Sequence, residues 1–254
     1  MSGGSDGTRR QERLPEESAL HNLPDYSPGE SGKALEATRM EVFVEAMTPP
    51  GPAHLQELEQ KALAEGVPII RPQTQNLIRF FLAMKRPARI LEIGTAVGFS
   101  ALFMQYYAPA DCRITTIEKD SERAAKARSN FIRYGRKNTC GEAEDIVLLE
   151  GDAAQVLGEI REDSSFDLIF MDAAKGQYIR FLPDAVRLLS PGGIMITDNI
   201  LQEGEILSSR FAVTRRNRTI HARMRAYLHA LMEEDRLETL LLPTGDGAAV
   251  SMKK

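Results

Sequence analysis

The 254-residue sequence contains only two cysteines, Cys112 and Cys140, and no apolar run long enough to cross a membrane. Two cysteines without paired spacing are too few for a disulfide framework and do not suggest a zinc site, so we interpret both as ordinary thiols. A membrane-spanning helix needs roughly 20 consecutive apolar residues. The N-terminus also lacks the apolar core of a secretory signal. These absences predict a cytoplasmic protein without a membrane partner.

An excess of positive charge is also lacking. The formal net charge of −4 excludes a uniformly basic nucleic-acid binder, although a sum over the whole chain can hide a local basic patch. Apolar residues make up 43% of the chain and charged residues 27%, which is enough apolar material for a packed core without metals or disulfides. The length suits one large α/β domain.

The first part of the chain is predicted to be a tail followed by helices. Residues 1–32 are rich in Gly, Ser, Pro and mixed charge and show no periodicity, which predicts a flexible tail. We expect a single domain over residues 33–254, which opens with a helical segment at 34–86. Apolar spacing, proline stops and the cap residue Gly66 predict its helices at about 34–47, 53–66 and 74–85.

Short apolar strands then alternate with helices. This pattern is typical of a parallel sheet covered on both faces. After a helix at about 216–234, two apolar segments joined by "TGDG" indicate a closing pair of strands at 237–243 and 248–253. The predicted fold is a doubly wound, mostly parallel α/β sheet with an antiparallel strand near the C-terminus. Its central strands are expected at 89–94, 113–118, 146–151, 166–172 and 193–199.

The segment "LEIGTAVGFS" leads from the first strand into a helix through Gly94 and Gly98, which permit a tight turn and close approach of a ligand. It lacks the G-x-G-x-x-G spacing of a dinucleotide site, which weakens that interpretation. Glu118 ends the second strand, where a carboxylate either accepts hydrogen bonds from ribose hydroxyls or is simply a solvated acid. Glu92 lies inside an apolar strand and should bind a polar group, because an unpaired buried carboxylate is costly. Asp152 follows the third strand, close to an adenine or as a helix N-cap.

Together these residues resemble the S-adenosylmethionine fingerprint of the class I methyltransferases, which have a Rossmann-like fold. The resemblance implies that Glu118 holds the ribose and that Gly94 and Ser100 lie against the methionine part. The full set of cofactor-binding residues that it implies is Glu92, Gly94, Thr95, Gly98, Ser100, Glu118, Asp152, Ala153 and Asp172.

Three oxygen-bearing side chains stand at the ends of two later strands. Asp172 ends one strand, and Asp198 and Asn199 end the next. If these strands are neighbours, the three side chains meet at the carboxyl edge of the sheet and suit Mg²⁺ or Mn²⁺. Such a metal would lower the pKa of a substrate hydroxyl, and Lys175 in the adjacent loop could take or stabilise the proton. The alternative is that the two aspartates are separate strand-end caps and Lys175 is a surface lysine.

The motifs "LEIGTAVGFS", "IEKD", "MDAAKGQY" and "TDNIL" resemble the metal-dependent O-methyltransferases related to catechol and caffeoyl-CoA methyltransferases, over roughly residues 36–254. The resemblance implies metal ligands at Asp172, Asp198 and Asn199 and a catalytic lysine at Lys175, with Asp172 serving both roles. It also implies a homodimer, because relatives are commonly dimers.

A narrower resemblance concerns the substrate. "VPIIRPQT", "DAAKGQY", "TDNIL" and "LPTGDGAAVSMK" are similar to segments of the bacterial tRNA 5-hydroxyuridine methyltransferases. That family methylates the 5-hydroxyl of the wobble uridine to 5-methoxyuridine, which implies a tRNA anticodon loop as partner. "RPQT" at 71–74 departs from the acidic residue that many relatives carry there.

A basic segment supports the same interpretation. No acid occurs between Ser208 and Ala230, and the arginines there could follow a phosphate backbone. The candidate RNA contacts are Arg215, Arg216, Arg218 and Arg223. Alternatively these arginines are the solvated face of a helix whose other face, formed by Ile220, Met224, Tyr227 and Leu231, packs on the sheet.

Two other functions use the same residues differently. A small catechol-like or phenolic acceptor would need the same site, with the arginines binding an acidic group such as coenzyme A. A non-catalytic nucleotide-binding module would need only the glycine turn and Glu118, which the presence of Asp172, Lys175 and Asp198 argues against.

Overall fold

The computed structural model describes residue 39 and residues 42–136, 145–201, 206, 214–215 and 217–254. The chain divides into a unit of residues 1–43 and a unit of residues 44–254. The predicted tail, residues 1–32, lies outside the described residues. The predicted helix at 34–47 is described at residues 39 and 42–47, all of which are helical.

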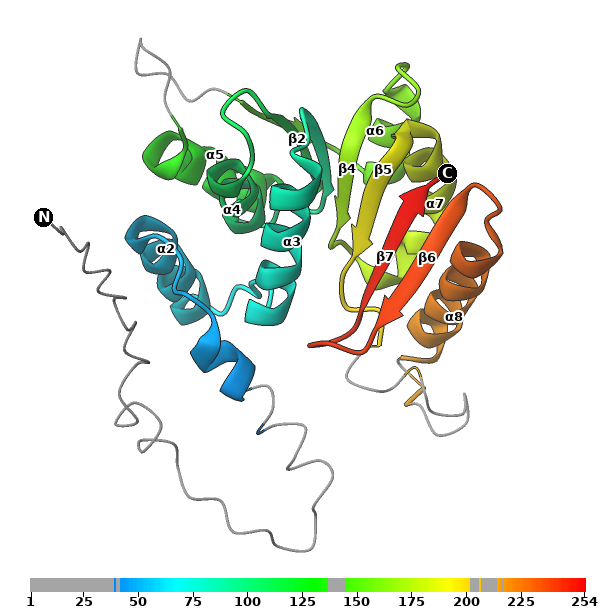
Figure 1. Cartoon of the computed structure of the whole chain (residues 1–254), viewed down its shortest axis with the longest axis horizontal. Helices are drawn as coiled ribbons and strands as arrows, with labels where there is room; N and C mark the ends of the chain where they lie inside the picture. Colours follow the sequence, from blue (N-terminus) through cyan, green and yellow to red (C-terminus); the bar gives the residue numbers. More distant parts are fainter. Residues whose placement is uncertain (1–38, 40–41, 137–144, 202–205, 207–213, 216) are drawn as a thin grey trace, which may run out of the picture. The chain divides into compact units, whose positions relative to one another are not determined.

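A seven-stranded mixed sheet forms the core of the second unit (Figure 1). Its strands lie in the order β3-β2-β1-β4-β5-β7-β6. The first five strands pair in parallel, whereas β7 is antiparallel to both of its neighbours, β5 and β6. The predicted fold class is therefore confirmed. The strands are β1 (Arg89–Ile93), β2 (Arg113–Glu118), β3 (Ile146–Glu150), β4 (Phe166–Met171), β5 (Leu189–Thr197), β6 (Leu237–Leu242) and β7 (Ala248–Lys253).

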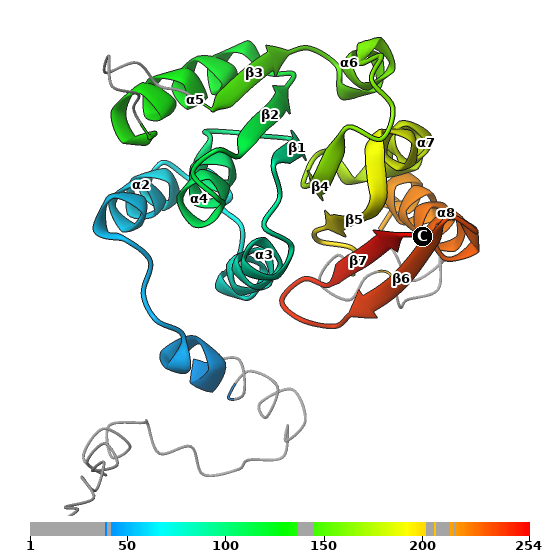
Figure 2. The ribbon, with the colours of Figure 1, turned by 45° about the horizontal axis from the view of Figure 1, so that its top comes forward.

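Helices cover both faces of the sheet, as Figure 2 shows. One face packs against α2 (Ala53–Ala64), α3 (Pro72–Lys85), α4 (Phe99–Tyr107) and α5 (Ser121–Tyr134). The other face packs against α6 (Ala153–Glu159), α7 (Tyr178–Leu188) and α8 (Arg218–Glu233). None of the described helices combines the length and the apolar character needed to cross a bilayer.

The central strands are apolar at nearly every position because both of their sides are buried. In β4, Phe170 packs with the α2–α5 layer, and Ile169 and Met171 pack with the α6–α8 layer. Burial of one such side chain contributes about 1.5–3 kcal/mol, so this double burial makes β4 a firm support for the residues that follow it.

The apolar face of α8 differs from the prediction at its first position. Met224, Tyr227 and Leu231 are buried as expected, but Ile220 is 39% exposed and His221 is 2% exposed. The prediction that Ile220 packs on the sheet was therefore wrong. Ile220 shares the i, i+4, i+7 spacing of the three buried residues, but it lies in the first turn of α8, where its side chain stays partly exposed. The Tyr227 ring packs against Tyr178, with ring centroids 5.5 Å apart.

Candidate active site

The parallel strands end at one edge of the sheet, beside a cavity of about 630 Å³. β1 and β4 are neighbours in the sheet although they are distant in sequence, so the strand order reverses between them. Ligands of doubly wound sheets bind at this reversal, outside the carboxyl ends of the strands. The cavity takes residues from the turns after all five parallel strands, including Gly94, Glu118, Asp152, Asp172 and Asn199.

The turn after β1 requires glycine at two positions. Gly94 has φ +98°, and a Cβ there would lie 2.2 Å from the Asp172 carbonyl oxygen. Gly98 has φ +85° and would place a Cβ 2.5 Å from the Phe131 ring. Gly94 therefore lines the cavity and lets the β1 and β4 ends approach each other, whereas Gly98 lets α4 and α5 pack behind the turn.

Glu92 and Thr95 do not line the cavity but lie buried beneath the same turn. One Glu92 carboxylate oxygen accepts hydrogen bonds from the Thr95 and Thr116 hydroxyls. The other, Oε1, has no hydrogen-bond partner among the described residues. Burial raises the pKa of Glu92. The polar partners expected for Glu92 thus include Thr95 of the glycine turn, which Glu92 supports from below. Ser100, the second residue of α4, lines the cavity.

Glu118 fastens the turns after β1 and β2 together. Its Oε2 accepts a hydrogen bond from the Ala96 backbone N–H at 2.9 Å. Its Oε1 accepts from the Lys119 and Asp120 N–H groups, also at 2.9 Å. A carboxylate has about four lone-pair positions, so these three bonds leave room for one further donor. Glu118 is therefore a structural anchor that still faces the cavity.

Asp152 is the N-cap of α6, since its Oδ1 accepts from the Ala154 N–H at 3.0 Å. Its Oδ2 accepts from Lys119 Nζ at 2.9 Å, and this contact holds the pKa of Asp152 below its usual value. Asp152 and Ala153 both line the cavity. The N-cap alternative is thus correct for Asp152, which also lines the cavity.

The three predicted metal ligands lie at the opposite end of the same cavity. Asp172 follows β4, and Asp198 and Asn199 follow β5, which is its neighbour. Asn199 has φ +56°, a left-handed conformation that asparagine adopts more readily than most residues. Asp198 is buried and accepts a hydrogen bond from the Thr74 hydroxyl at 3.0 Å.

The chemistry of this set fits a divalent cation. Burial, and then the charges of Asp198 and Glu92, raise the pKa of Asp172 to about 7. Burial also raises the pKa of Asp198. Asp198 is buried and Asp172 is partly buried, and a cation between them would stabilise the charged forms that this environment disfavours. No group of three His, Cys, Asp or Glu side chains with metal-binding geometry occurs among the described residues, so a cation here would rely on Asn199 for its third protein oxygen.

Lys175 reaches the same end of the cavity from η2 (Lys175–Gln177), the short 3₁₀ turn after Asp172. Its Nζ forms an ion pair with Asp246 Oδ2 at 3.2 Å. Asp246 and Thr74 were not predicted as site residues. Both come from parts of the chain that no strand-end motif marks: Thr74 from the first turn of α3, and Asp246 from the β6–β7 turn.

The predicted RNA-contact arginines lie in or just before α8. Arg223 is exposed, and its Nη1 donates to the Gly176 carbonyl oxygen at 3.4 Å, directly beside Lys175. Arg218 is partly exposed and Arg215 is exposed, whereas Arg216 lies outside the described residues. The structure therefore brings Arg223 next to the loop that carries Lys175.

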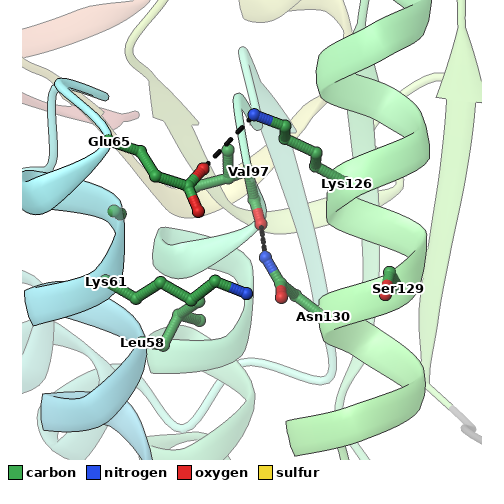
Figure 3. A pocket seen from close by; sticks show the side chains of 8 residues that line it. Leu58, Lys61, Glu65, Val97, Lys126, Ser129 and Asn130 are labelled. Atoms are coloured by element: carbon green, nitrogen blue, oxygen red, sulfur yellow. Dashed lines mark hydrogen bonds and ion pairs between the residues drawn. The ribbon is translucent and has the colours of Figure 1, made fainter.

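A second cavity, of about 110 Å³, lies between α2 and α5, behind the glycine turn (Figure 3). Lys126 forms an ion pair with Glu65 at 3.3 Å across it. Asn130 Nδ2 donates to the Val97 carbonyl oxygen at 2.8 Å. The polar contacts of this cavity thus tie α5 to α2 and to the turn that lines the larger cavity.

We expect Asn130→Ala to lower the free energy of unfolding by about 1 kcal/mol, the typical contribution of one such hydrogen bond. The Val97 carbonyl would lose its partner, and the glycine turn would become less ordered. Chemical denaturation measures the free energy of unfolding. Calorimetric titration measures the affinity for the expected cofactor, which should fall if the glycine turn is less ordered. Ser129→Ala, one residue away on α5, is the control and should change neither value.

The family model for O-methyltransferases matches residues 50–254, which is more than half of the chain. The catechol O-methyltransferase of Niastella koreensis is 31% identical over 151 residues, spanning 58% of this chain and 66% of that protein. The caffeoyl-CoA O-methyltransferase of Citrus natsudaidai is 25% identical over 226 residues, spanning 86% and 94%.

Solved structures resemble the chain over most of its length. An S-adenosylhomocysteine-bound methyltransferase from Podospora anserina has a TM-score of 0.75 and 26% identity, covering 91% of this chain and all of that one. A putative caffeoyl-CoA O-methyltransferase from Staphylococcus aureus has a TM-score of 0.74 and 27% identity, covering 87% of this chain.

With this fold and this site, the chain belongs to the O-methyltransferase family. The prediction of an S-adenosylmethionine-dependent O-methyltransferase is confirmed at the level of the enzyme class.

Proposed function

We propose that the chain transfers a methyl group from S-adenosylmethionine to the 5-hydroxyl of 5-hydroxyuridine at the tRNA wobble position, with the help of a divalent metal. The methyl donor would lie across Gly94, Glu118 and Asp152, which line one end of the cavity. The S-adenosylhomocysteine-bound relative from Podospora anserina supports this cofactor. Glu118 would use its remaining lone-pair position for a ribose hydroxyl.

Asp172, Asp198 and Asn199 would hold Mg²⁺ or Mn²⁺ at the other end. Bound there, the ion would lower the pKa of the acceptor hydroxyl. The Lys175 ammonium would stabilise the negative charge left on the acceptor oxygen when its proton leaves to solvent. That oxygen then attacks the methyl carbon while the bond from carbon to sulfur breaks, so the chain acts mainly by positioning the two reactants.

The observation that carries the RNA acceptor is the contact of Arg223 with Gly176. It brings one arginine of the basic segment beside Lys175. Arg71 also lines the cavity, from the loop before α3. Positive side chains at the mouth of an acidic site suit an acceptor that carries phosphates on both sides, as a nucleotide within an anticodon loop does. Such loops present unstacked bases that a pocket can receive.

A small phenolic acceptor is the second candidate. It is favoured by the similarity to the catechol O-methyltransferase of Niastella koreensis and the caffeoyl-CoA O-methyltransferase of Citrus natsudaidai. Both candidates use the same donor, metal and lysine. The arginines separate an RNA acceptor from a neutral catechol, because only an acceptor that carries several phosphates needs several positive contacts.

The deciding experiment measures label from S-adenosylmethionine in three acceptors: an anticodon stem-loop with 5-hydroxyuridine, the same stem-loop with uridine, and catechol. Each is assayed with Mg²⁺ and with a chelator. We expect metal-dependent label in the first acceptor alone, with a KM that rises steeply with salt. Label confined to catechol would establish the second candidate. Label in none of them would overturn the proposal.

Arg223→Gln should raise the KM for the stem-loop several-fold and reduce its salt slope by about one, the effect of losing one phosphate contact. Its kcat should not change, since Arg223 does not touch the reacting atoms. Arg225→Gln is the matched control, because Arg225 lies on the same helix but donates to the Ile206 carbonyl oxygen. Equal effects of the two substitutions would mean that only the total charge of α8 matters.

The homodimer and the cytoplasmic location stay predictions. Light scattering coupled to size-exclusion chromatography tests the first, and cell fractionation tests the second.

A further inference from the structure

The β6–β7 turn brings a buried acid to the Lys175 side chain. Asp246 is 5% exposed and accepts from Lys175 Nζ at 3.2 Å, across 71 residues of sequence. The lysine is only half-buried by comparison, with 34% of its side chain exposed. A lysine carries its charge on a flexible four-carbon stem, so a fixed partner decides where the ammonium lies.

The turn that carries Asp246 is itself fixed to the loop after β5. The Ile200 N–H donates to the Gly247 carbonyl oxygen at 3.0 Å, and the Leu201 N–H donates to the Asp246 carbonyl oxygen at 2.9 Å. Gly247 has φ +79°, and a Cβ there would lie 2.2 Å from the Leu201 side chain. This loop begins with Asp198 and Asn199. The backbone bonds therefore hold the Asp246 carboxylate at a fixed position relative to the proposed metal ligands.

Two other carboxylates compete for the same ammonium. Asp172 and Asp198 both lie within the electrostatic reach of Lys175. Without Asp246, the flexible lysine would swing toward them and leave the position from which it faces an acceptor oxygen. The Lys175–Asp246 ion pair would therefore determine where the ammonium lies, which an ion pair between two mobile surface side chains would not do.

We propose that Asp246 is a positioning residue that holds the Lys175 ammonium in its working place. The inference rests on the proposed role of Lys175 and is independent of which acceptor the enzyme uses. Asp246 touches neither donor nor acceptor in this scheme. In this scheme its effect on the reaction passes through Lys175, and this is the property that an experiment can isolate.

Asp246→Asn keeps the shape of the side chain and the backbone bonds of the turn but removes the charge. We expect kcat to fall by a factor on the order of ten to a hundred, the cost of misplacing a reacting group by about 1 Å. The affinity for S-adenosylmethionine should not change. Glu238→Gln is the matched control, because it removes the exposed Lys254–Glu238 ion pair from the same hairpin. It should leave kcat at the wild-type value.

A double-mutant cycle with Lys175→Met gives the decisive readout. If Asp246 acts through Lys175, Asp246→Asn causes no further fall in kcat once the lysine is gone. If Asp246→Asn lowers kcat by the same factor in the Lys175→Met background as in the wild type, the inference is overturned while the role of Lys175 stands. If Lys175→Met alone leaves kcat unchanged, the proposed role of the lysine fails instead. The two failures are therefore distinguishable.

Two further measurements keep the inference testable if Asp246→Asn does not fold. Asp246→Glu retains the charge but displaces it, and should lower kcat less than Asp246→Asn does, again only when Lys175 is present. Crystal structures should show Lys175 Nζ moved toward Asp172 or Asp198 in the Asp246 variant that folds. An unmoved Nζ in that variant would contradict the inference.

Discussion

Asp172→Ala is expected to reduce metal-dependent methyl transfer by about a thousandfold or more, because a metal in such a site contributes several kcal/mol of transition-state stabilisation. The substitution removes one of the three proposed oxygen ligands from a cavity lined by the buried Asp198 and the partly buried Asp172. The assay measures label transferred from S-adenosylmethionine to the best acceptor across a Mg²⁺ titration.

Stability measurements separate the loss of a ligand from damage to the fold. Burial disfavours the charged form of Asp172 and raises its pKa, so in a chelator Asp172→Ala should unfold at nearly the wild-type denaturant concentration. Added Mg²⁺ should stabilise the wild type, by about 2.7 kcal/mol at a hundred times the Kd, and leave the variant unchanged. Asp167→Asn is the control and should keep its activity, because Asp167 lies on β4, the strand that Asp172 follows, but accepts hydrogen bonds from the Ala88 and Arg89 N–H groups. Undiminished transfer by Asp172→Ala would refute the metal mechanism.

Much of the fold could be predicted because its strands are buried on both sides. Double burial selects apolar residues along most of a strand, as in β4, and helices between such strands imply parallel pairing. The position of β7 between β5 and β6 could not be predicted in the same way. It depends on pairing between β5 and a strand far along the chain, which leaves no local pattern. The error at Ile220 has a similar origin: Ile220 fits the apolar spacing of α8 and is exposed, whereas His221 is buried although a polar residue predicts exposure.

The residues of the candidate site also fall into two groups: those that a local sequence pattern predicts and those that only long-range contacts bring to the site. Asp172, Asp198 and Asn199 follow apolar strands, so the topology alone predicts that they meet at one edge. Thr74 reaches Asp198 across 124 residues, and Asp246 reaches Lys175 across 71. In "TGDG" an aspartate between glycines predicts a turn and nothing more. Residues that support the reacting groups from other elements are therefore the part that only the folded structure reveals.

Lys175→Met should lower kcat by a factor on the order of a hundred to a thousand, the usual cost of removing one charge-stabilising group from an active site. Methionine keeps most of the length of the side chain, so the packing of η2 should persist. The acceptor oxygen would lose the positive charge that stabilises it, while the donor end of the cavity, at Glu118 and Asp152, would not change. Calorimetric titration should therefore give the wild-type affinity for S-adenosylmethionine.

Lys119→Met provides the matched control, because Lys119 lines the opposite end of the same cavity, where it pairs with Asp152 at 2.9 Å. That exposed pair borders the proposed donor position, so its loss should weaken cofactor binding modestly and leave kcat at saturating donor unchanged. Opposite responses from two lysines of one cavity would assign chemistry to one end and donor binding to the other. If Lys175→Met lost cofactor affinity and kcat in equal measure, Lys175 would be a structural residue, and the charge on the acceptor oxygen would have to be stabilised by other groups.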